Sequence, residues 1–390
     1  MNSHTYSKLN VLHLISGDLW AGAETMAYSL LNRLKDFDNL EVSAILLNEG
    51  KLADELHARG FAVHVIDEKL NSFWEVFRKT LKIISSSPPD IIHSHRYKEN
   101  LLALLLSGCY RGIKLVSTQH GLPEFHEKLP NISQRIKTRT NFWNLSHFFT
   151  TVAVSNDIRN ALVSHFGFRK EQIEVIHNGI ELPPSSSAFG GKAGTLVVGS
   201  SGRLFPVKDY PLMVEIARAV ATTGAKDVRF ELAGDGPELP ALEALVQRYG
   251  LNDRFILKGH QDDMNSFYRG LDIYLNTSIH EGIPMTILEA LAHGLPVIAP
   301  AVGGIVEIID DGREGFLIDS RNTRNFAEKC LYLKDNRGER QKMAQAARDK
   351  AERAFSAEKM ADSYHRIYRQ IAAPVQIRHG RQTAIFKRVP

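Results

Sequence analysis

The sequence predicts an α/β protein built from two doubly wound parallel sheets. Three observations lead to this prediction: the length of 390 residues, the alternation of short apolar runs with helix-like segments, and one break rich in proline, serine and glycine near the middle. A chain of this length exceeds a typical single core and suits two domains of about 200 residues each. Strand–helix alternation favours parallel sheets. We therefore expect two Rossmann-like domains that face each other across a cleft.

The expected strands are short runs that are apolar throughout, which indicates strands covered on both faces. In the first half of the chain they span residues 11–15, 42–47, 61–66, 90–95, 114–118, 151–155 and 174–177. In the second half they span residues 195–199, 229–233, 254–258, 272–276, 296–299 and 315–318. Open α/β sheets bind ligands at the carboxyl ends of their strands, so the loops after these runs are the expected binding loops.

The break between the halves is the segment PPSSSAFGG at residues 183–191. Proline and glycine at this density continue neither a helix nor a central strand. The predicted domains therefore span residues 1–185 and 186–358.

Composition narrows the class of protein. The net charge of +4 is mild, and it predicts no nucleic-acid partner. The longest apolar run, residues 101–106, is far shorter than the roughly 20 residues that span a bilayer. Cys109 and Cys330 form no CxxC pair and no disulfide framework, which fits a reducing compartment. We expect a cytoplasmic protein that is at most peripheral on the inner face of a membrane.

A candidate phosphate loop follows the first expected strand of the second half, in the segment GSSGRLFPVK at residues 199–208. Its small residues let the backbone approach a ligand closely. Arg203 can grip phosphate with two hydrogen bonds, and Lys208 adds a point charge, so the pair suits a diphosphate. The alternative is a surface loop with two solvated cations. The turn around Gly234, LAGDGP at residues 232–237, is a second such element, and by itself it could be a tight turn.

The first half has a related loop, SGDLWAGAE at residues 16–24, between a strand and a helix. Gly22 stands just before the expected start of that helix, and helix N-termini attract anions. The loop matches neither G-x-G-x-x-G nor G-x-x-x-x-G-K, which argues against dinucleotide binding and against a P-loop NTPase.

The segment HEGIPMTILEALAHG at residues 280–294 contains two glutamates. Gly282 permits a tight turn, and Pro284 suits the first turn of a helix, where its missing N–H costs nothing. Glu281 and Glu289 lie eight residues apart, about 80° round a helix, so both can face one cleft. The amides of Ile283, Met285 and Thr286 lie between them and could receive phosphate oxygens. The alternative is that both glutamates favour the helix start and a solvated face.

Together these pieces resemble glycosyltransferase family 4, the retaining enzymes with the GT-B fold and an E-x7-E motif. The resemblance extends from about residue 10 to residue 368. The matching pieces, in order, are DIIHSH (90–95), TQHG (118–121), VS (154–155), VIHNGI (175–180), GRL (202–204) with Lys208, AGDGP (233–237), Glu281 with Glu289, and VGGIVE (302–307).

The resemblance implies a role for each matching residue. By it, Arg203 and Lys208 are the diphosphate clamp, Glu289 binds the ribose, and Glu281 binds the donor sugar. His120 is similar to the histidine near the reacting sugar, and Gly22 to part of the loop that meets the phosphates. The implied donor site also includes Gly234, Gly282, Ile283, Pro284, Met285 and Thr286. The family often has two glycines before Ala-Glu, whereas this chain has Ala21-Gly22.

The resemblance also implies an activity. The first domain would take the acceptor and the second the nucleotide sugar, with a helix at about residues 360–380 returning to the first domain. The expected reaction moves a sugar, with retention, from a UDP- or GDP-linked donor to a glycan or lipid-linked acceptor. Bacterial surface polysaccharide or lipopolysaccharide synthesis is the expected pathway.

The motif His93-x-His95 could suggest a metal site. No third ligand stands nearby in sequence, so we expect no metal.

Two basic stretches could meet an anionic membrane. Residues 128–149 combine cations with aromatic rings, namely Lys128, Arg135, Lys137, Arg139, Phe142, Trp143, Phe148 and Phe149. They fit a segment at the membrane surface that receives a lipid-linked acceptor, or a helix with one buried and one solvated face. The tail at residues 378–388 is basic and has no acid, which fits contact with lipid head groups or a solvated end.

Three other functions would require different features. A sugar-nucleotide epimerase of the GT-B fold would share the fold and the nucleotide site but would transfer no sugar. A non-catalytic glycan-binding homologue would not need the full set of donor-site residues. A dehydrogenase would need a dinucleotide fingerprint, which the sequence lacks.

Overall fold

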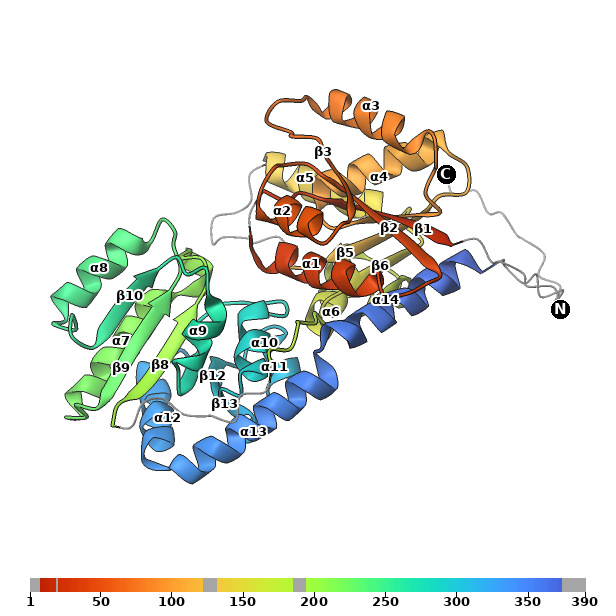
Figure 1. The fold of residues 1–390 in the computed structure, drawn as a ribbon. Helices are drawn as coiled ribbons and strands as arrows, with labels where there is room; N and C mark the ends of the chain where they lie inside the picture. Colours follow the sequence, from red (N-terminus) through yellow and green to blue (C-terminus); the bar gives the residue numbers. More distant parts are fainter. Residues whose placement is uncertain (1–7, 19, 122–131, 185–193, 374–390) are drawn as a thin grey trace, which may run out of the picture.

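A computed structural model of the chain describes residues 8–18, 20–121, 132–184 and 194–373, without the side chains of residues 132–138. It has two α/β domains, each built on a parallel sheet with helices on both faces (Figure 1). The first sheet has seven strands in the order β3-β2-β1-β4-β5-β6-β7, and the second has six in the order β10-β9-β8-β11-β12-β13. The predicted fold class is confirmed, and each expected strand overlaps an observed one.

The first domain alternates strands and helices along the chain. Its elements are β1 (Leu9–Ile15), α1 (Gly22–Leu34), β2 (Leu40–Leu46), α2 (Lys51–Ala58), β3 (Ala62–Val65), α3 (Phe73–Ile84), β4 (Ile91–Ser94), α4 (Tyr97–Cys109), β5 (Lys114–Gln119), α5 (Ile132–Leu145), β6 (Thr150–Ala153), α6 (Asn156–Phe166), a 3-10 turn (Lys170–Gln172) and β7 (Ile173–Val175).

The second domain repeats the pattern and ends in three consecutive helices. Its elements are β8 (Leu196–Ser201), a 3-10 turn (Pro206–Lys208), α7 (Tyr210–Thr222), β9 (Val228–Ala233), α8 (Leu239–Arg248), β10 (Phe255–Gly259), α9 (Met264–Arg269), β11 (Ile273–Leu275), α10 (Met285–Ala292), β12 (Val297–Pro300), α11 (Ile305–Ile308), β13 (Gly315–Ile318), α12 (Thr323–Asp335), α13 (Arg337–Ala354) and α14 (Ala357–Ala372).

Each sheet has a point where the strand order reverses. In the first sheet this point lies between β1 and β4, and in the second it lies between β8 and β11. Doubly wound sheets bind ligands at this point, beyond the carboxyl ends of the strands. The loops that border it begin at Ser16 and His95 in the first domain, and at Gly202 and Asn276 in the second.

The chain crosses between the domains twice, and the two crossings touch. Ile180 bridges Ser356 as a parallel pair: the Ile180 amide donates to the Phe355 carbonyl at 2.9 Å, and the Ala357 amide donates to the Ile180 carbonyl at 2.8 Å. A Cβ on Gly179 would lie 2.6 Å from the Ser356 carbonyl oxygen, so only glycine fits this approach. The two segments in which the chain passes between the domains therefore lie side by side and are hydrogen-bonded to each other.

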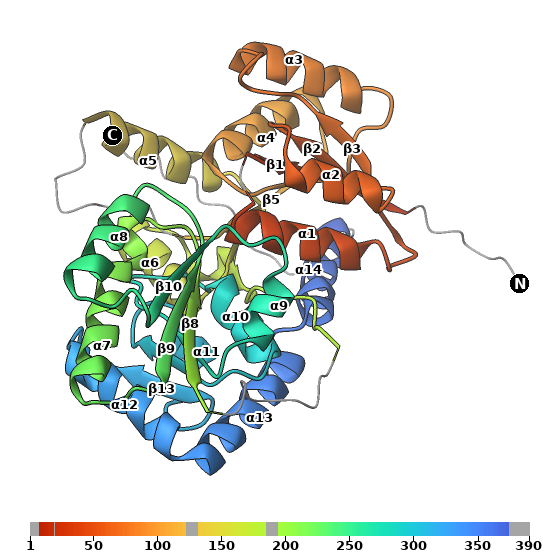
Figure 2. The same cartoon turned by 60° about the vertical axis from the view of Figure 1, so that its left-hand side comes forward.

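After the second crossing, α14 packs against the first domain, along α1 (Figures 1 and 2). Its apolar face is buried, including Tyr364 and Tyr368, which are both 0% exposed. The basic tail at residues 378–388 lies outside the described residues. No helix in the part of the chain that the structure describes is both long and apolar enough to cross a membrane.

Candidate active site at the domain interface

Two glycine loops of the second domain pack as one unit. The amide of Leu204 donates to the carbonyl of Asp235 at 2.9 Å, which joins the loop after β8 to the loop after β9. Gly234 has φ +146°, and a Cβ there would lie 1.9 Å from the Gly202 carbonyl oxygen. Gly234 therefore packs directly against the backbone of the loop after β8, and no side chain would fit between the two loops.

Lys208 and Glu281 form the central ion pair of this domain. The Lys208 ammonium lies 2.5 Å from Glu281 Oε1, and the Ser278 hydroxyl donates to the same oxygen at 2.7 Å. Both charged side chains are less than one-fifth exposed, at 19% for the lysine and 13% for the glutamate. Arg203 stands outside this pair: it is exposed, and its guanidinium carbon lies 5.0 Å from the centre of the Phe205 ring.

The loop that carries Lys208 is held in place by Arg321. The guanidinium of Arg321 donates to the carbonyls of Thr277 and Ser278, at 3.0 and 3.3 Å, and it pairs with Asp209. Thr277 in turn donates its hydroxyl to the Lys208 carbonyl at 2.9 Å. Asp209 has φ +46°, the left-handed region that non-glycine residues rarely adopt. Such a conformation persists where the surrounding contacts determine it, and Arg321 supplies one of them.

Glu289 lies one turn inside α10, half-buried. The Tyr268 hydroxyl donates to Glu289 Oε2 at 2.6 Å. Burial raises the pKa of Glu289 to about 7, although the Tyr268 hydrogen bond acts in the opposite direction. Pro284 is the N-cap of α10, and the first amides of a helix, here those of Met285 and Thr286, have no acceptor within it. A carboxyl with a strongly raised pKa is a common property of functional sites.

The first domain meets this segment directly. A Cβ on Gly282 would lie 2.8 Å from the His120 carbonyl oxygen, and one on Gly22 would lie 3.5 Å from Met285 Cγ. Gly22 is the first residue of α1, and Met285 is the first of α10. Two helix N-termini therefore meet at the domain interface, and both favour a bound anion.

Two further glycines close the same turn from within the second domain. The Gly304 amide donates to the Glu281 carbonyl at 3.0 Å. A Cβ on Gly303 would lie 2.1 Å from the Glu281 carbonyl oxygen, and one on Gly304 would lie 1.7 Å from that of Gly282. The Gly-Gly pair after β12 therefore determines where the Glu281–Gly282 peptide lies.

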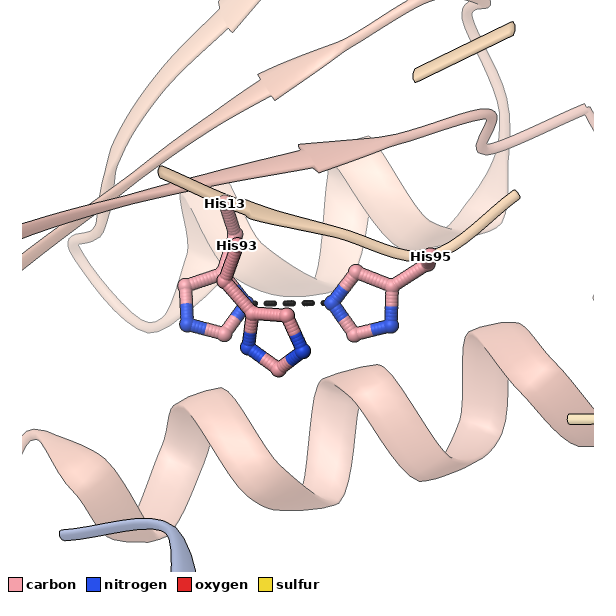
Figure 3. Close-up of side chains that lie close together, drawn as sticks. All are labelled: His13, His93 and His95. Atoms are coloured by element: carbon pink, nitrogen blue, oxygen red, sulfur yellow. Dashed lines mark hydrogen bonds between the residues drawn. The ribbon is translucent and has the colours of Figure 1, made fainter. Parts of the chain in front are cut away.

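Four histidines gather at the carboxyl edge of the first sheet, on β1, at the end of β4 and after β5. His13 and His93 pair across β1 and β4. His13 Nδ1 lies 3.2 Å from His95 Nε2, and His95 Nδ1 lies 3.2 Å from His120 Nε2. Figure 3 shows His13, His93 and His95 close together, with a dashed line joining His13 to His95. Burial lowers the pKa of all four imidazoles, to about 3 for His13 and His120, so they are neutral at physiological pH.

Arg96 lies next to this group and connects it to α1. Its guanidinium lies 2.6 Å from Glu24 Oε1 and 3.2 Å from Asp18 Oδ1. Glu24 is fully buried in the first turn of α1, and burial raises its pKa against the opposing charge of Arg96. The charge of Arg96 also helps to lower the pKa of His120, after the larger effect of burial.

Glu307 of the second domain forms hydrogen bonds with the N-terminus of α6 in the first domain. Its carboxylate accepts from the amides of Asn156 and Asp157, at 2.9 and 3.1 Å, and pairs with His177 at 3.0 Å. Burial alone would raise the pKa of Glu307, but these hydrogen bonds lower it overall. Beside it, His280 lies 3.2 Å from Asp157. The family-like pieces at residues 154–155, 175–180 and 302–307 therefore meet at one contact between the domains.

The structure brings most of the predicted site residues to one place. Gly22 and His120 approach from the first domain, and Lys208, Glu281, Gly282, Ile283, Pro284, Met285, Thr286 and Glu289 from the second. Arg203 is exposed at the edge of the group, and Gly234 lies behind its loop. Sequence reasoning missed Tyr268, Ser278, Arg321 and His13. A lone tyrosine or arginine far along the chain has no local signal, whereas His13 could have been noticed from its position in an apolar strand.

Known glycosyltransferases match this chain in sequence and in fold. Residues 20–182 match the family model described as Glycosyltransferase Family 4, and residues 186–350 match the model described as Glycosyl transferases group 1. The Escherichia coli UDP-Gal:alpha-D-GlcNAc-diphosphoundecaprenol alpha-1,3-galactosyltransferase is 23% identical over 384 residues, which cover 93% of this chain and 97% of that protein. The D-inositol 3-phosphate glycosyltransferase of Kribbella flavida is 25% identical over 288 residues, 67% of each chain.

Solved structures show the same fold. Anabaena HepE in complex with UDP and glucose has a TM-score of 0.78 and 21% identity, covering 92% of this chain and 99% of that one. Sucrose-phosphate synthase from Thermosynechococcus elongatus has a TM-score of 0.75 and 18% identity, covering 93% and 99%. The family models together span almost all of both domains, and the paired sheets have the GT-B arrangement. This chain therefore belongs to the family 4-like glycosyltransferases.

Proposed function

We propose that this glycosyltransferase uses a nucleotide-diphosphate sugar and retains the configuration at the transferred carbon. The observation that carries the proposal is the meeting of the Lys208–Glu281 pair, the start of α10 and Glu289 at the interface with His120. This arrangement offers positive charge for a diphosphate and carboxylates for sugar and ribose hydroxyls. UDP bound in the Anabaena HepE structure supports a uridine nucleotide, and GDP is the alternative.

In the proposed donor complex, Lys208 and Arg203 hold the two phosphates together with the amides of Met285 and Thr286. Lys208 would turn from Glu281 to a phosphate oxygen, and the freed Glu281 carboxylate would accept hydrogen bonds from the donor sugar. Glu289, in its ionised form, would accept from the ribose hydroxyls. These groups stabilise the charge that develops on the leaving diphosphate.

The proposed reaction takes place on one face of the sugar. The bond from the anomeric carbon to the leaving phosphate oxygen breaks, and a bond to the acceptor oxygen forms on the same side. The acceptor's proton passes to the leaving phosphate oxygen, so no protein base is needed. The residues contribute by positioning the substrates and stabilising charge, which can account for large rate enhancements.

We further propose that the reaction needs no metal. The cations and helix amides at the interface supply the charge that a divalent ion would otherwise provide for a diphosphate. His13, His93 and His95 are the one group among the described residues whose ligand atoms lie close enough for an ion, within 4.8 Å of one another. They are fully buried, and His13 and His95 already hydrogen-bond each other.

The acceptor would be a glycan or a lipid-linked glycan, as in bacterial surface polysaccharide or lipopolysaccharide synthesis. The Escherichia coli relative, which matches along nearly the whole chain, is named for a diphosphoundecaprenol-linked acceptor. The first domain also has a largely apolar cavity of about 350 Å³ between α3 and α4, at the carboxyl edge of its sheet. Phe73, Val76, Tyr97, Leu101 and Leu102 contribute to its lining, which could hold part of a lipid.

The deciding experiment is a panel of nucleotide sugars, assayed for release of nucleotide with and without glycan acceptors. We expect one UDP- or GDP-sugar to be consumed without added metal and in the presence of EDTA, and the anomeric configuration of the product to be that of the donor. An inverted product would contradict the retaining mechanism. Interconversion of two nucleotide sugars without transfer would instead favour the epimerase, and binding without turnover would favour a non-catalytic homologue.

We propose that the surface around the end of α5 lies on an anionic membrane. Trp143 is 62% exposed and Phe149 is 52% exposed, near the exposed Arg139, whereas the other two rings of the predicted stretch, Phe142 and Phe148, are buried. Exposed aromatic rings beside cations are typical of surfaces that rest on head groups. The remaining cations of the stretch at residues 128–149 lie where the side chains are not described. We expect the protein to float with liposomes that contain anionic lipid. The double variant Trp143→Ala/Phe149→Ala should bind these liposomes more weakly. Tyr332→Ala, which removes an exposed ring of the second domain, is the control. Equal flotation of both variants would contradict the proposal.

A further inference from the structure

A continuous series of hydrogen bonds runs from His120 at the domain interface to the return helix α14. It passes from His120 to His95 and on to His13, with nitrogen–nitrogen distances of 3.2 Å at both steps. His13 Nε2 then lies 3.3 Å from the Tyr368 hydroxyl. We call His120, His95, His13 and Tyr368 the histidine relay. Its four members come from the loop after β5, the end of β4, β1 and α14.

The Tyr368 hydroxyl has a second partner, which determines the direction of these bonds. It lies 2.6 Å from His93 Nδ1, whereas His93 Nε2 lies 2.8 Å from the Thr118 hydroxyl. Hydroxyl donors make the shortest hydrogen bonds, and N–H donors rarely approach oxygen so closely. The 2.6 Å contact therefore fits Tyr368 as the donor to His93, and the longer contact fits His13 Nε2–H as the donor to Tyr368.

This direction propagates along the relay, because a neutral imidazole has one N–H and one lone pair. His13 donates from Nε2, so its Nδ1 must accept from His95 Nε2–H. His95 then accepts at Nδ1 from His120 Nε2–H. The remaining nitrogen, His120 Nδ1, is left with a lone pair. It is buried, and it has no hydrogen-bond partner among the residues that the structure describes.

We propose that Tyr368 sets the tautomer of His120 through His13 and His95, so that His120 Nδ1 accepts a hydrogen bond from a hydroxyl of the bound sugar. The substrate part of this inference rests on the proposed function, whereas the tautomer is a property of the free protein. Buried polar atoms without a partner are uncommon and often belong to binding sites, and a sugar hydroxyl is a suitable donor. Tyr368, His13 and His95 are positioning residues, since only His120 would touch the substrate.

The lowered pKa values of these imidazoles are consistent with the relay, because each ring must be neutral to donate at one nitrogen and accept at the other. A metal ion at His13, His93 and His95 is less compatible with the geometry. It would need the lone pair of His13 Nδ1 or His95 Nε2, which already face each other. It would also place two positive charges in a fully buried site, at a high cost in solvation.

The first test is the tautomer of the free protein, from nitrogen chemical shifts of protein labelled with ¹⁵N-histidine. We expect His120, His95, His13 and His93 all to carry the proton on Nε2. His293 and His147 are internal controls of the opposite kind, because their Nδ1 atoms lie 2.8 and 2.9 Å from the carbonyl oxygens of Glu289 and Trp143. The His120 signal is identified by its loss in His120→Asn. A proton on Nδ1 of His120 would overturn the inference.

The second test removes the Tyr368 hydroxyl. In Tyr368→Phe we expect His120 to become a mixture of tautomers and kcat to fall about tenfold, as when the partner that fixes a histidine tautomer is lost. The affinity for the free nucleoside diphosphate, which lacks the sugar, should stay unchanged, because in the proposed function the second domain binds that part. Tyr364→Phe is the matched control: it removes a buried hydroxyl from the same helix, one that pairs with Thr118 at 2.8 Å and lies outside the relay. Equal kinetic losses in both variants, or an unchanged His120 tautomer in Tyr368→Phe, would contradict the inference.

The two proposals fail in different ways. If no nucleotide sugar is consumed by the wild-type protein, the proposed function fails, while the ¹⁵N spectrum still decides the direction of the relay. Metal analysis of protein dialysed against zinc adds an independent check. One zinc per chain that is lost in His13→Gln would overturn the relay, because the ion would occupy nitrogens that the relay needs.

Discussion

Lys208→Met is expected to lower kcat/KM for sugar transfer by about a hundredfold in a protein that remains folded. Removing one preorganised group that stabilises the developing charge typically costs this much. Lys208 is held at 2.5 Å from Glu281, and its loop is fixed by Thr277 and Arg321, so its charge is already in place before the diphosphate leaves. Methionine keeps the length of the side chain and removes the charge. Steady-state kinetics with the donor identified by the panel measures the effect.

Two comparisons separate this effect from a general loss of charge. Lys226→Met removes an exposed lysine of the same domain, and its kinetics should match the wild type. The double variant with Glu281→Gln should lose less than the sum of the two single losses, expressed as free energies, because the residues are in contact. Wild-type turnover by a folded Lys208→Met protein would contradict the clamp assignment.

Nucleotide-sugar affinity is expected to increase about tenfold between pH 6 and pH 8. Glu289 has a pKa of about 7 in the free protein and must be ionised to accept two ribose hydroxyls. With that pKa, about a tenth of the molecules are ionised at pH 6 and about nine-tenths at pH 8. Each phosphate of a nucleotide sugar has a single, strongly acidic ionisable oxygen that stays charged across this range, so the phosphates add no pH dependence of their own. Calorimetry at several pH values measures the affinity and the protons released on binding.

Glu289→Gln should bind more weakly than the wild type at pH 8 and lose the pH dependence. Glu99→Gln is the matched control, since burial also raises the pKa of Glu99 to about 7, in α4 of the first domain. That variant should keep the pH dependence of binding. If Glu289→Gln retains the full pH dependence, another group is responsible for it.

The raised pKa values of Glu289 and Glu99 also make the free energy of unfolding depend on pH. A carboxyl with a higher pKa in the folded protein binds more protons when folded than when unfolded, between its ordinary value near 4.5 and about 7. The free energy of unfolding therefore falls as the pH rises through this window. Both Glu289→Gln and Glu99→Gln should reduce the decrease in the free energy of unfolding over this pH window. Stability measurements therefore do not distinguish the two residues, whereas the pH dependence of ligand binding does.

The sequence by itself determined the fold class and the local form of the donor segment. Strands were predictable because each is a short apolar, β-branched run, and its signal lies within a few adjacent residues. Gly282 and Pro284 likewise indicated a turn followed by a helix, and the structure has α10 beginning at Met285. The family resemblance rested on such short segments in order, and both family models match where those segments lie.

Only the tertiary structure decided which distant residues became partners. His13 reaches His93 and His95 because β4 returns to pair with β1, and Tyr368 reaches His13 because α14 crosses back to the first domain. Tyr268 and Glu289 meet because α9 and α10 pack beside the same sheet. These contacts depend on strand order and on which faces are buried. Both result from packing of the whole chain, so no local pattern around His13 or Tyr368 could have identified them.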